Sequence, residues 1–426
     1  MNKTIPFAAA CLALAAHAAD PSIREGSVTM TQDPSSRQVV IQYELENAPA
    51  IVTVDILTNG VSIGASNLKY FAGDVHRIVR PSGTKRITWR PDKAWPGHEI
   101  TDQSVTAKVT AWALNAPPDV MVVDLVVADQ YDFYTSLASL PGKGGVSNDL
   151  YKTDKMVFRK CPAANITWRM GAPSTEPGYA ADQAAHLVTL SNDFYMGIYT
   201  LTQRQYERIT GKASCATKKD AERHDVMPMT DISWAQMRMN SDNTVNADYD
   251  WPSCGHVVNP ASVLGKLRTL TGNRLAFDLP LEAQWEFACR AGTGTGLYTG
   301  KEITADNVCP NVAEIACYEG NNSGCPDPVG SHLRNNWGFY DMCGNVLEFC
   351  LDYYYGTYDN VDPETGAQVD ADGKVIAKGT RAWRGGAYNN NAKGCRSDAR
   401  YNWGTIQLVG DYVGFRIAAV AELTEP

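Results

Sequence analysis

Residues 336–350 decide the fold of this chain, and they read Asn336-Trp337-Gly338-Phe339-Tyr340-Asp341-Met342-Cys343-Gly344-Asn345-Val346-Leu347-Glu348-Phe349-Cys350. Aromatic, small and carboxylate residues follow one another here in an order that fits neither the period of a helix nor the alternation of a strand. The segment is therefore informative as a motif and not as a secondary-structure pattern.

Six further motifs accompany this segment in a fixed order along the chain. They read Phe194-Tyr195-Met196-Gly197-Ile198-Tyr199, Pro228-Met229-Thr230-Asp231-Ile232-Ser233-Trp234, Leu279-Pro280-Leu281-Glu282-Ala283-Gln284-Trp285-Glu286-Phe287-Ala288-Cys289-Arg290-Ala291-Gly292-Thr293, Val329-Gly330-Ser331, Arg384-Gly385-Gly386 and Gly414-Phe415-Arg416. Together the seven segments resemble the formylglycine-generating enzyme (sulfatase-modifying factor) family, which has a divergent C-type-lectin-like fold. The resemblance runs from about Val157 to Ala419.

The length and charge of the chain restrict its class. A chain of 426 residues is long for one domain, so two globular units are expected. The net charge of −9 argues against nucleic acid as a partner, because proteins that bind nucleic acid usually carry a basic face.

The N-terminus has the three parts of a secretory signal. Lys3 supplies the positive charge, Ile5 to Ala16 the apolar core, and Ala16-His17-Ala18 the cleavage site. We therefore predict a signal peptide at residues 1–18 and an extracytoplasmic location, periplasmic or secreted. No later stretch approaches about 18 unbroken apolar residues, so no membrane span is expected.

Residues 19–117 are predicted to form a β-sandwich of the immunoglobulin or fibronectin kind. Segments 38–45, 51–57, 86–89 and 105–112 are rich in β-branched residues and partly alternating, and the turn dipeptide Asn59-Gly60 follows the second. Residues 118–155 are predicted as a connector, with the boundary near residue 150. We see no catalytic constellation in the sandwich.

Residues 156–420 are predicted to form a loop-rich domain with a few helices, which makes the whole chain α+β. Thr202 and Ser233 each begin a capping-box pattern, and Pro280 opens a helix that carries Trp285 and Cys289 on one face. A long loop-rich domain needs further support, for which disulfides and bound cations are the usual means.

One departure from the family pattern concerns catalysis. The family's enzymes oxidise a sulfatase cysteine to formylglycine, with copper held by two cysteines between the Arg-Gly-Gly segment and a later segment that begins with cysteine. Here that interval reads Ala387-Tyr388-Asn389-Asn390-Asn391-Ala392-Lys393-Gly394, without cysteine. Copper(I) prefers soft thiolates, which asparagine cannot replace. Copper binding and oxidase activity are therefore not expected unless another cysteine pair converges from elsewhere.

Two other family features carry over as expectations. The resemblance implies a calcium site made by the carboxylates of Asp341 and Glu348 and the carbonyls of Gly344 and Val346, a ligand set of hard oxygen atoms. A weaker second site is expected near Asn311 and Val312. The resemblance also implies a disulfide between Cys289 and Cys395, which would connect the 280–292 helix to the C-terminal segment.

The region around the missing cysteines has the composition of a binding surface, because Tyr and Trp give rigid contact area and Asn gives adaptable hydrogen bonds. Its candidate binding residues are Tyr388, Asn389, Asn390, Asn391, Tyr401, Trp403 and Tyr412. Arg384, Cys395 and Phe415 are expected to lie below them as scaffold. The composition is similar to the variable region of retroelement-diversified display proteins of this fold.

The sequence therefore favours a non-catalytic protein that binds an unknown protein or glycan ligand. An active formylglycine-generating oxidase is the alternative, and a purely structural envelope protein is a third possibility.

Overall fold

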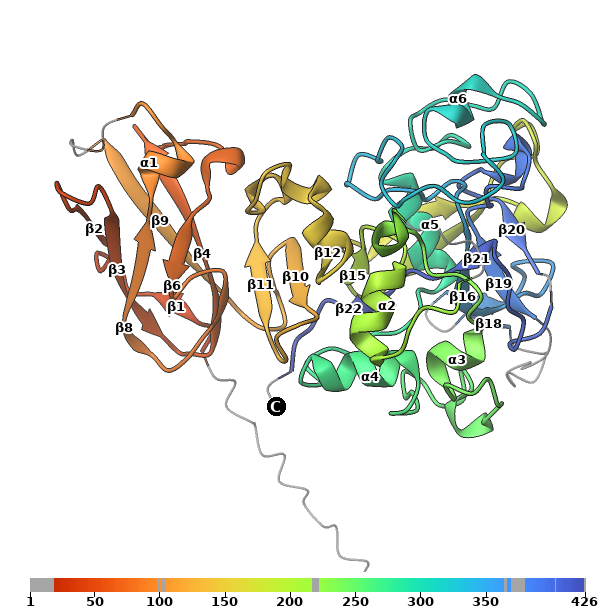
Figure 1. The fold of residues 1–426 in the computed structure, drawn as a ribbon, viewed down its shortest axis with the longest axis horizontal. Coiled ribbons are helices and arrows are strands. Elements are labelled where there is room, and N and C mark those ends of the chain that lie inside the picture. The colour runs from red at the N-terminus through yellow and green to blue at the C-terminus, as the bar shows by residue number, and fades with distance from the viewer. Residues whose placement is uncertain are drawn as a thin grey trace, which may run out of the picture.

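The computed structural model describes residues 19–424 except 99, 101–103, 217–221, 364–365, 369–379 and 403. The predicted signal peptide and Trp403 lie outside the described residues. Two units lie side by side along the longest axis, an all-β unit at one end and a larger mixed unit at the other (Figure 1). The described part of the C-terminal segment returns toward the middle of the molecule, where Leu423 N–H bonds the carbonyl of Leu114 at 3.0 Å.

The first unit consists of two antiparallel sheets. One sheet contains β1 (Ser22–Ile23), β2 (Thr29–Gln32), β3 (Val39–Glu46), β6 (Phe71–Gly73) and β8 (Gly83–Trp89), with β3 and β8 at its centre. The other contains β4 (Ala50–Thr58), β5 (Val61–Ser62), β7 (Arg77–Val79) and β9 (Val105–Trp112). The short helix α1 (Pro91–Ala94) follows β8.

Alternation along the strands explains the core of this unit. In β3, Val39, Ile41, Tyr43 and Leu45 are buried while the residues between them are not. They share one hydrophobic cluster with Val52, Val54 and Ile56 of β4. Strands occur at all four predicted places, and Asn59-Gly60 forms the β4–β5 turn, with φ values of 50° and 79°. Whether the unit is immunoglobulin-like or fibronectin-like stays a prediction.

The segment predicted as a connector contributes strands to the second unit. Its β10 (Val120–Asp124) pairs with β11 (Tyr131–Tyr134) on one side and β12 (Lys155–Cys161) on the other. The sheet continues through β15 (Phe194–Gly197) to β22 (Ala418–Val420). The fully buried run of β10 therefore reflects a central strand of a sheet and not a free linker.

His76 of the first unit joins this sheet at its edge. Its carbonyl accepts the N–H of Phe133 in β11 at 2.8 Å, and its Nδ1 bonds the Phe133 carbonyl at 2.8 Å. The imidazole also stacks on Tyr134 with ring centroids 4.6 Å apart. The edge of β11 is therefore occupied at Phe133, and the two units are in direct contact.

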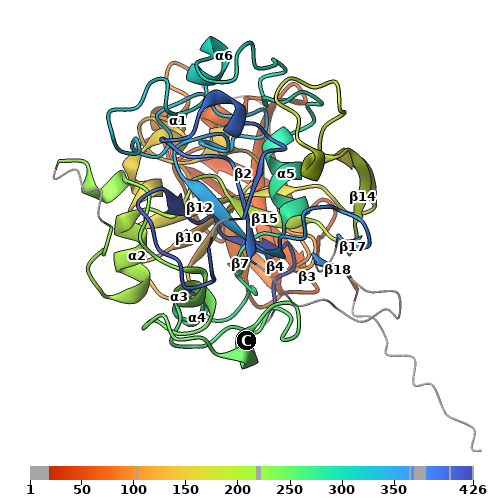
Figure 2. The ribbon, with the colours of Figure 1, turned by 90° about the vertical axis from the view of Figure 1, so that its right-hand side faces the viewer.

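The second unit has five described helices, α2 (Gln203–Thr210), α3 (Trp234–Arg238), α4 (Val263–Leu270), α5 (Glu282–Arg290) and α6 (Pro310–Ala313). Both predicted capping boxes are present: Thr202 and Gln205 exchange hydrogen bonds of 3.1 Å each, and Ser233 and Gln236 bonds of 3.1 and 2.9 Å. Viewed from this end, β12 and β15 lie centrally, with α2, α3 and α4 on one side and α5 on the other (Figure 2).

A second, four-stranded sheet has the order β20 (Arg400–Tyr401), β19 (Arg381–Arg384), β16 (Leu347–Tyr353) and β21 (Val413–Gly414). The hairpins β13 (Ile166–Met170) with β14 (His186–Leu190) and β17 (Val361–Asp362) with β18 (Ala367–Gln368) complete the strands. Much of the rest is loop, and none of the described helices is both long and apolar enough to cross a membrane.

Residues 336–350 form an irregular turn that leads into β16. Asp341, Gly344 and Asn345 have φ values of 56°, 89° and 68°, in the left-handed region. A Cβ on Gly344 would lie 2.6 Å from the carbonyl oxygen of Cys317, so only glycine fits there. The absence of helical or strand periodicity in the sequence therefore has a backbone cause.

Candidate binding face

Buried arginines fix the segment that carries the predicted binding residues. Arg384 bonds Glu286 of α5 and donates to the carbonyl of Asp398 at 2.9 Å. Arg400 bonds both oxygens of Glu282, at 2.9 and 2.6 Å. Burial alone would raise the pKa of Glu286, but the charges of Arg290 and Arg384 hold it below its usual value. The segment is therefore attached to α5 by paired charges in the interior.

The predicted scaffold residues lie beneath the surface as expected. Arg384, Cys395 and Phe415 all have an exposed fraction of 0%. Phe415 stacks on Phe349 of β16, with ring centroids 5.4 Å apart.

The predicted face residues are more enclosed than a display surface would require. Of the six that the structure describes, Asn389 is exposed, Tyr388 is buried at 6%, and Asn390, Asn391, Tyr401 and Tyr412 are half-buried. Trp403 lies outside the described residues.

Hydrogen bonds within the segment account for this enclosure. Asn390 Oδ1 accepts the N–H of Ala387 at 2.8 Å, and Asn391 caps a short 3-10 helix, Ala392–Gly394. Tyr401 donates its hydroxyl to the Gly394 carbonyl at 3.0 Å, and Tyr388 donates to Asp411 at 3.2 Å. These side chains stabilise the loop, and their composition alone did not reveal that role.

A neighbouring loop that we did not single out is more accessible. Thr405, Gln407 and Val409 are exposed. Gln407 and Asn243 exchange two side-chain-to-carbonyl hydrogen bonds, of 2.9 and 3.1 Å, so the loop is held in place. The flanking glycines Gly404 and Gly410 were the available sequence signal for a displayed loop.

The predicted disulfide between Cys289 and Cys395 is not present. All ten cysteines in the described part of the chain carry free thiols. Cys289 Sγ lies 3.9 Å from Cys343 Sγ, so the α5 cysteine approaches the 336–350 turn. Burial raises the pKa of Cys395 to about 12 and that of Cys343 well above its ordinary value. Both thiols therefore remain protonated and buried.

Copper does not fit the residues of the 387–394 interval, which contains no cysteine. Cys289 and Cys343 do converge, but each is fully buried. The Cys289–Cys343 pair therefore has no exposed surface, and it lies outside the 387–394 interval.

The two carboxylates expected to bind calcium have different surroundings. Glu348 accepts four hydrogen bonds: two from Arg416 at 2.9 and 3.0 Å, one from Thr200 at 2.9 Å and one from Trp285 at 2.6 Å. Four donors occupy the in-plane lone pairs of both oxygens. Glu348 is thus neutralised by Arg416 and does not fit as a cation ligand in this arrangement.

Asp341 fits a cation better. Its Oδ2 accepts the N–H of Gly330 at 2.7 Å, whereas its Oδ1 is buried without a hydrogen-bond partner among the described residues. Burial raises the pKa of Asp341 to about 6. A buried carboxylate oxygen without a donor needs a cation or a proton.

The structure places Gly344 and Val346 in the same turn, and both are buried. At the second expected site, Asn311 uses its side-chain amide to bond the Glu302 carbonyl at 2.8 Å, and Val312 is fully buried. The described residues contain no group of three or more His, Cys, Asp or Glu side chains that could hold a metal ion.

Comparison with known protein families confirms the family that the sequence motifs indicated. A model of the sulfatase-modifying factor enzyme 1-like domain matches residues 160–421. The chain belongs to this family. The matched residues begin within β12 and extend beyond β22, so the family domain contains the second sheet, all helices from α2 onward and the whole 384–416 segment.

Two curated relatives show the range within this similarity. The formylglycine-generating enzyme of Streptomyces coelicolor is 33% identical over 161 residues, which cover 34% of this chain and 48% of that enzyme. The chaperone protein LppX of Paenibacillus barcinonensis is 26% identical over 191 residues, 39% of this chain and 64% of that protein. The chain thus spans less than two thirds of either relative.

Solved structures with a similar fold include PvdO from Pseudomonas aeruginosa. The match has a TM-score of 0.47 and 21% sequence identity, and it covers 62% of this chain and 94% of the PvdO chain. The Treponema denticola variable protein 1 is similar to the same extent, with a TM-score of 0.46 and 20% identity over 62% of this chain and 95% of that one.

Proposed function

We propose that this protein is a non-catalytic, extracytoplasmic binding protein that recognises a protein or glycan ligand. The observation that carries the proposal is the 387–394 interval, which keeps the family's scaffold on both sides and lacks both thiolates. Without thiolates the family's copper chemistry has no ligands at this place. The relative named a chaperone protein is in line with a role in binding another protein.

The accessible part of the 384–416 segment supports the binding role. Asn389, Thr405 and Gln407 are exposed polar residues on loops that hydrogen bonds hold in place. Ordered loops bind with a smaller entropic cost than mobile ones. We infer that the ligand contacts these loops and not the half-buried tyrosines.

The first unit is proposed to act as a spacer or docking module of the immunoglobulin-like kind. Its described residues consist of two sheets around one apolar core. The sequence signal at residues 1–18 supports export of the whole chain.

Calcium is proposed to bind at the 336–350 turn with Asp341 as its carboxylate ligand. The carbonyls of Gly344 and Val346 are the other candidate ligands within this chain. A bound cation would give the buried Oδ1 of Asp341 the partner that it lacks among the described residues.

The catalytic alternative is tested by incubating the purified mature chain with Cu(I) and a sulfatase-type cysteine peptide. The S. coelicolor enzyme assayed in parallel is the positive control. Mass spectrometry should detect no aldehyde product with this chain. Turnover of about one per second or faster would establish the oxidase instead.

The binding role is tested with protein and glycan arrays probed with the wild type. A Thr405→Ala, Asn389→Ala double variant should lose the protein and neutral-glycan signals that the wild type gives, because it removes exposed hydrogen-bonding groups and keeps the Gln407 side chain that anchors the loop. A Gln42→Ala variant, exposed on the first unit, is the matched control. Full retention of all signals by the double variant would contradict the proposed face.

Retroelement diversification has an independent genetic test. A near-copy of the coding segment for residues 384–416 beside a reverse transcriptase gene would establish it. If that copy is absent, diversification is rejected and the general binding role remains.

A further inference from the structure

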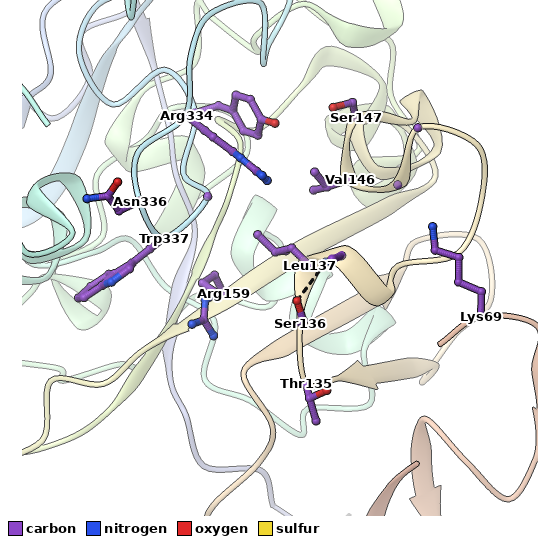
Figure 3. Close-up of a pocket in the computed structure, with 15 residues that line it drawn as sticks. Lys69, Thr135, Ser136, Leu137, Val146, Ser147, Arg159, Arg334, Asn336 and Trp337 are labelled. Atoms are coloured by element: carbon purple, nitrogen blue, oxygen red, sulfur yellow. Dashed lines mark hydrogen bonds between the residues drawn. The ribbon is translucent and has the colours of Figure 1, made fainter. Parts of the chain in front are cut away.

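A large cavity opens where the first unit meets the family domain. Its volume is about 690 Å³, and it is lined by Lys69 of the first unit and, on the other side, by the β11–β12 connection and the loop around Arg334. Figure 3 shows the Arg334 side chain extending toward Leu137 and Val146, with Lys69 beyond them. The cavity is separate from the 384–416 segment, none of whose described residues lines it.

The charge of the cavity is opposite to that of the protein. Lys69, Arg159 and Arg334 line it, and none of the described residues in its lining is acidic. Arg159 forms an ion pair with Asp119 at 2.8 Å. Lys69 and Arg334 form no ion pair within the described part of the chain, although the whole chain carries a net charge of −9. Two unpaired cations facing one cavity attract an anion.

The walls of the cavity are held in place before any ligand arrives. Asn335, next to Arg334, donates to the carbonyls of Ala288 and Cys289 at 2.7 and 3.0 Å. On the opposite wall, Tyr199 donates its hydroxyl to the Val146 carbonyl at 3.0 Å. Such a preformed wall reduces the ordering cost of binding.

The remaining lining groups suit a ligand with many hydroxyl groups. Thr135, Ser136, Ser147 and Asn336 supply neutral hydrogen-bonding side chains. The hydroxyl of Ser136 accepts the N–H of Ala138 at 3.2 Å, so its own proton is available to a ligand. A cavity of this size holds a drug-sized ligand, on the order of two to three sugar rings.

Two other polyanions fit less well. Single-stranded nucleic acid needs free aromatic stacking surfaces, but both aromatic rings in the lining already pack on other rings. Trp337 lies 5.2 Å from Phe287 and Tyr340 lies 5.0 Å from Tyr199, between ring centroids. An extended acidic peptide would pair with a free strand edge, but His76 occupies both backbone groups of Phe133 in the edge strand β11.

We propose that this cavity binds an anionic oligosaccharide, with Arg334 and Lys69 pairing with its carboxylate or sulfate groups and the hydroxyl and amide side chains bonding its sugar hydroxyls. Because Lys69 and Arg334 belong to different units, the bound saccharide also connects the two units. This site is independent of the proposed binding face, so either can fail without the other.

Calorimetric titration of the full mature chain tests the proposal with four probes. A trigalacturonate supplies carboxylates, a heparin-derived tetrasaccharide supplies sulfate esters, cellotriose is the neutral control, and tetraglutamate is the acidic peptide. At least one of the two anionic saccharides should bind, and the neutral one should not. Whichever anionic saccharide binds identifies the charged group that the cavity recognises.

Matched variants decide where binding occurs. Arg334→Ala and Lys69→Ala should each weaken saccharide binding about tenfold or more, which corresponds to one lost charged contact. Lys393→Ala changes the net charge equally at an exposed lysine outside the cavity and should leave binding unchanged. Arg334 is exposed and Lys69 is half-buried, so neither substitution removes a core side chain. Circular dichroism of each variant checks that the fold is retained.

Three results with these probes and single variants would overturn the proposal, and a charge-reversal variant adds a fourth. They are the absence of saccharide binding up to about 10 mM, an equal loss in the Lys393→Ala variant, and equal or tighter binding of tetraglutamate. The last result would assign the cavity to an acidic peptide. A double Lys69→Glu, Arg334→Glu variant must also abolish binding, and binding that survives this charge reversal rejects the site.

Discussion

The two units of this protein exclude water from their interiors in different ways. Among the described residues of the first unit, few polar side chains are buried: Thr53, and the imidazole of His76 where the unit meets β11. The core otherwise consists of aliphatic and aromatic residues. The family domain buries Arg238, Arg381, Arg384, Arg396 and Arg416 almost completely. The second unit thus adds long-range charge pairs to its two apolar clusters, whereas the strands of the first unit pack around an apolar core.

This difference has an energetic consequence. Apolar burial contributes in small increments that depend on the area removed from water. A buried ion pair contributes little net stability while both partners are present, but the loss of one partner leaves an uncompensated charge. The two units should therefore respond differently to single substitutions.

The largest effect is expected for Arg416→Met, which leaves Glu348 buried without its counter-charge. The family domain should lose about 3–5 kcal/mol of unfolding free energy. Urea unfolding monitored by hydrogen exchange measures the unfolding free energy of the family domain separately from that of the first unit. The double variant Arg416→Met, Glu348→Gln should recover much of the loss, because no charge is left unpaired. A loss below about 1 kcal/mol for the single variant would show that charge pairing does not hold the domain.

The contact between the units should depend on pH through His76. Burial lowers the pKa of His76 to about 4 from its ordinary value of 6.5. As the pH falls, the unfolded chain therefore takes up a proton on His76 before the folded chain does. The contribution of neutral His76 to the free energy of unfolding is fully present above pH 6.5 and is lost as the pH falls toward 4. The loss amounts to roughly 3 kcal/mol.

Hydrogen exchange at the Phe133 amide, measured between pH 7 and 4, reports this loss, because that N–H bonds the His76 carbonyl. A His98→Gln variant, exposed in the same unit, should keep the wild-type profile. A protection factor of the Phe133 amide that does not change with pH, after correction for the intrinsic exchange rate, would contradict the assigned role of His76.

Calcium should stabilise the family domain by mass action, by about 2.7 kcal/mol at a concentration one hundred times the Kd. Without the cation, the raised pKa of Asp341, about 6, means that stability falls as the pH rises from about 4 through 6. Calcium should remove this decrease.

Thermal unfolding at pH 7.5 with calcium or a chelator measures the effect. Asp341→Asn should abolish both the calcium shift and the pH dependence, since the amide resembles the protonated acid. If the wild type shows no calcium dependence, Asp341 is a buried protonated acid and not a ligand.

The smallest effect is expected in the first unit for Ile41→Val, which removes one methylene from a fully buried position. The cost should be about 1 kcal/mol, confined to the first unit and independent of salt. The exposed neighbour Gln42→Ala should change stability by less than about 0.5 kcal/mol. A larger, salt-dependent effect of Ile41→Val would remove the distinction between the two units.

Much of the fold followed from local sequence patterns. Alternation predicted β3, β4, β8 and β9, and the Thr202 and Ser233 patterns predicted two helix starts with their caps. The motifs of residues 194–416 predicted the family. These features depend on near neighbours or on a shared order of motifs, so a single sequence contains them.

The candidate site was predicted less well. Arg384, Cys395 and Phe415 lie beneath the surface as expected, but Tyr388 is buried and Asn390 and Tyr401 bond their own loop. The Cys289–Cys395 disulfide is absent, and Cys343 lies beside Cys289. Composition identifies residues that are able to bind, but it does not say which of them the loop uses for its own hydrogen bonds.

The sequence by itself determined the family, the strand and helix pattern and the loss of the thiolate pair, because each of these is written in residue identity and local spacing. The tertiary structure alone decided that Arg416 neutralises Glu348, that His76 occupies the edge of β11, and that Lys69 and Arg334 face one cavity. Those partners lie 57 to 265 residues apart. Charge pairing over such separations depends on how loops and strands return through space, which local periodicity does not specify.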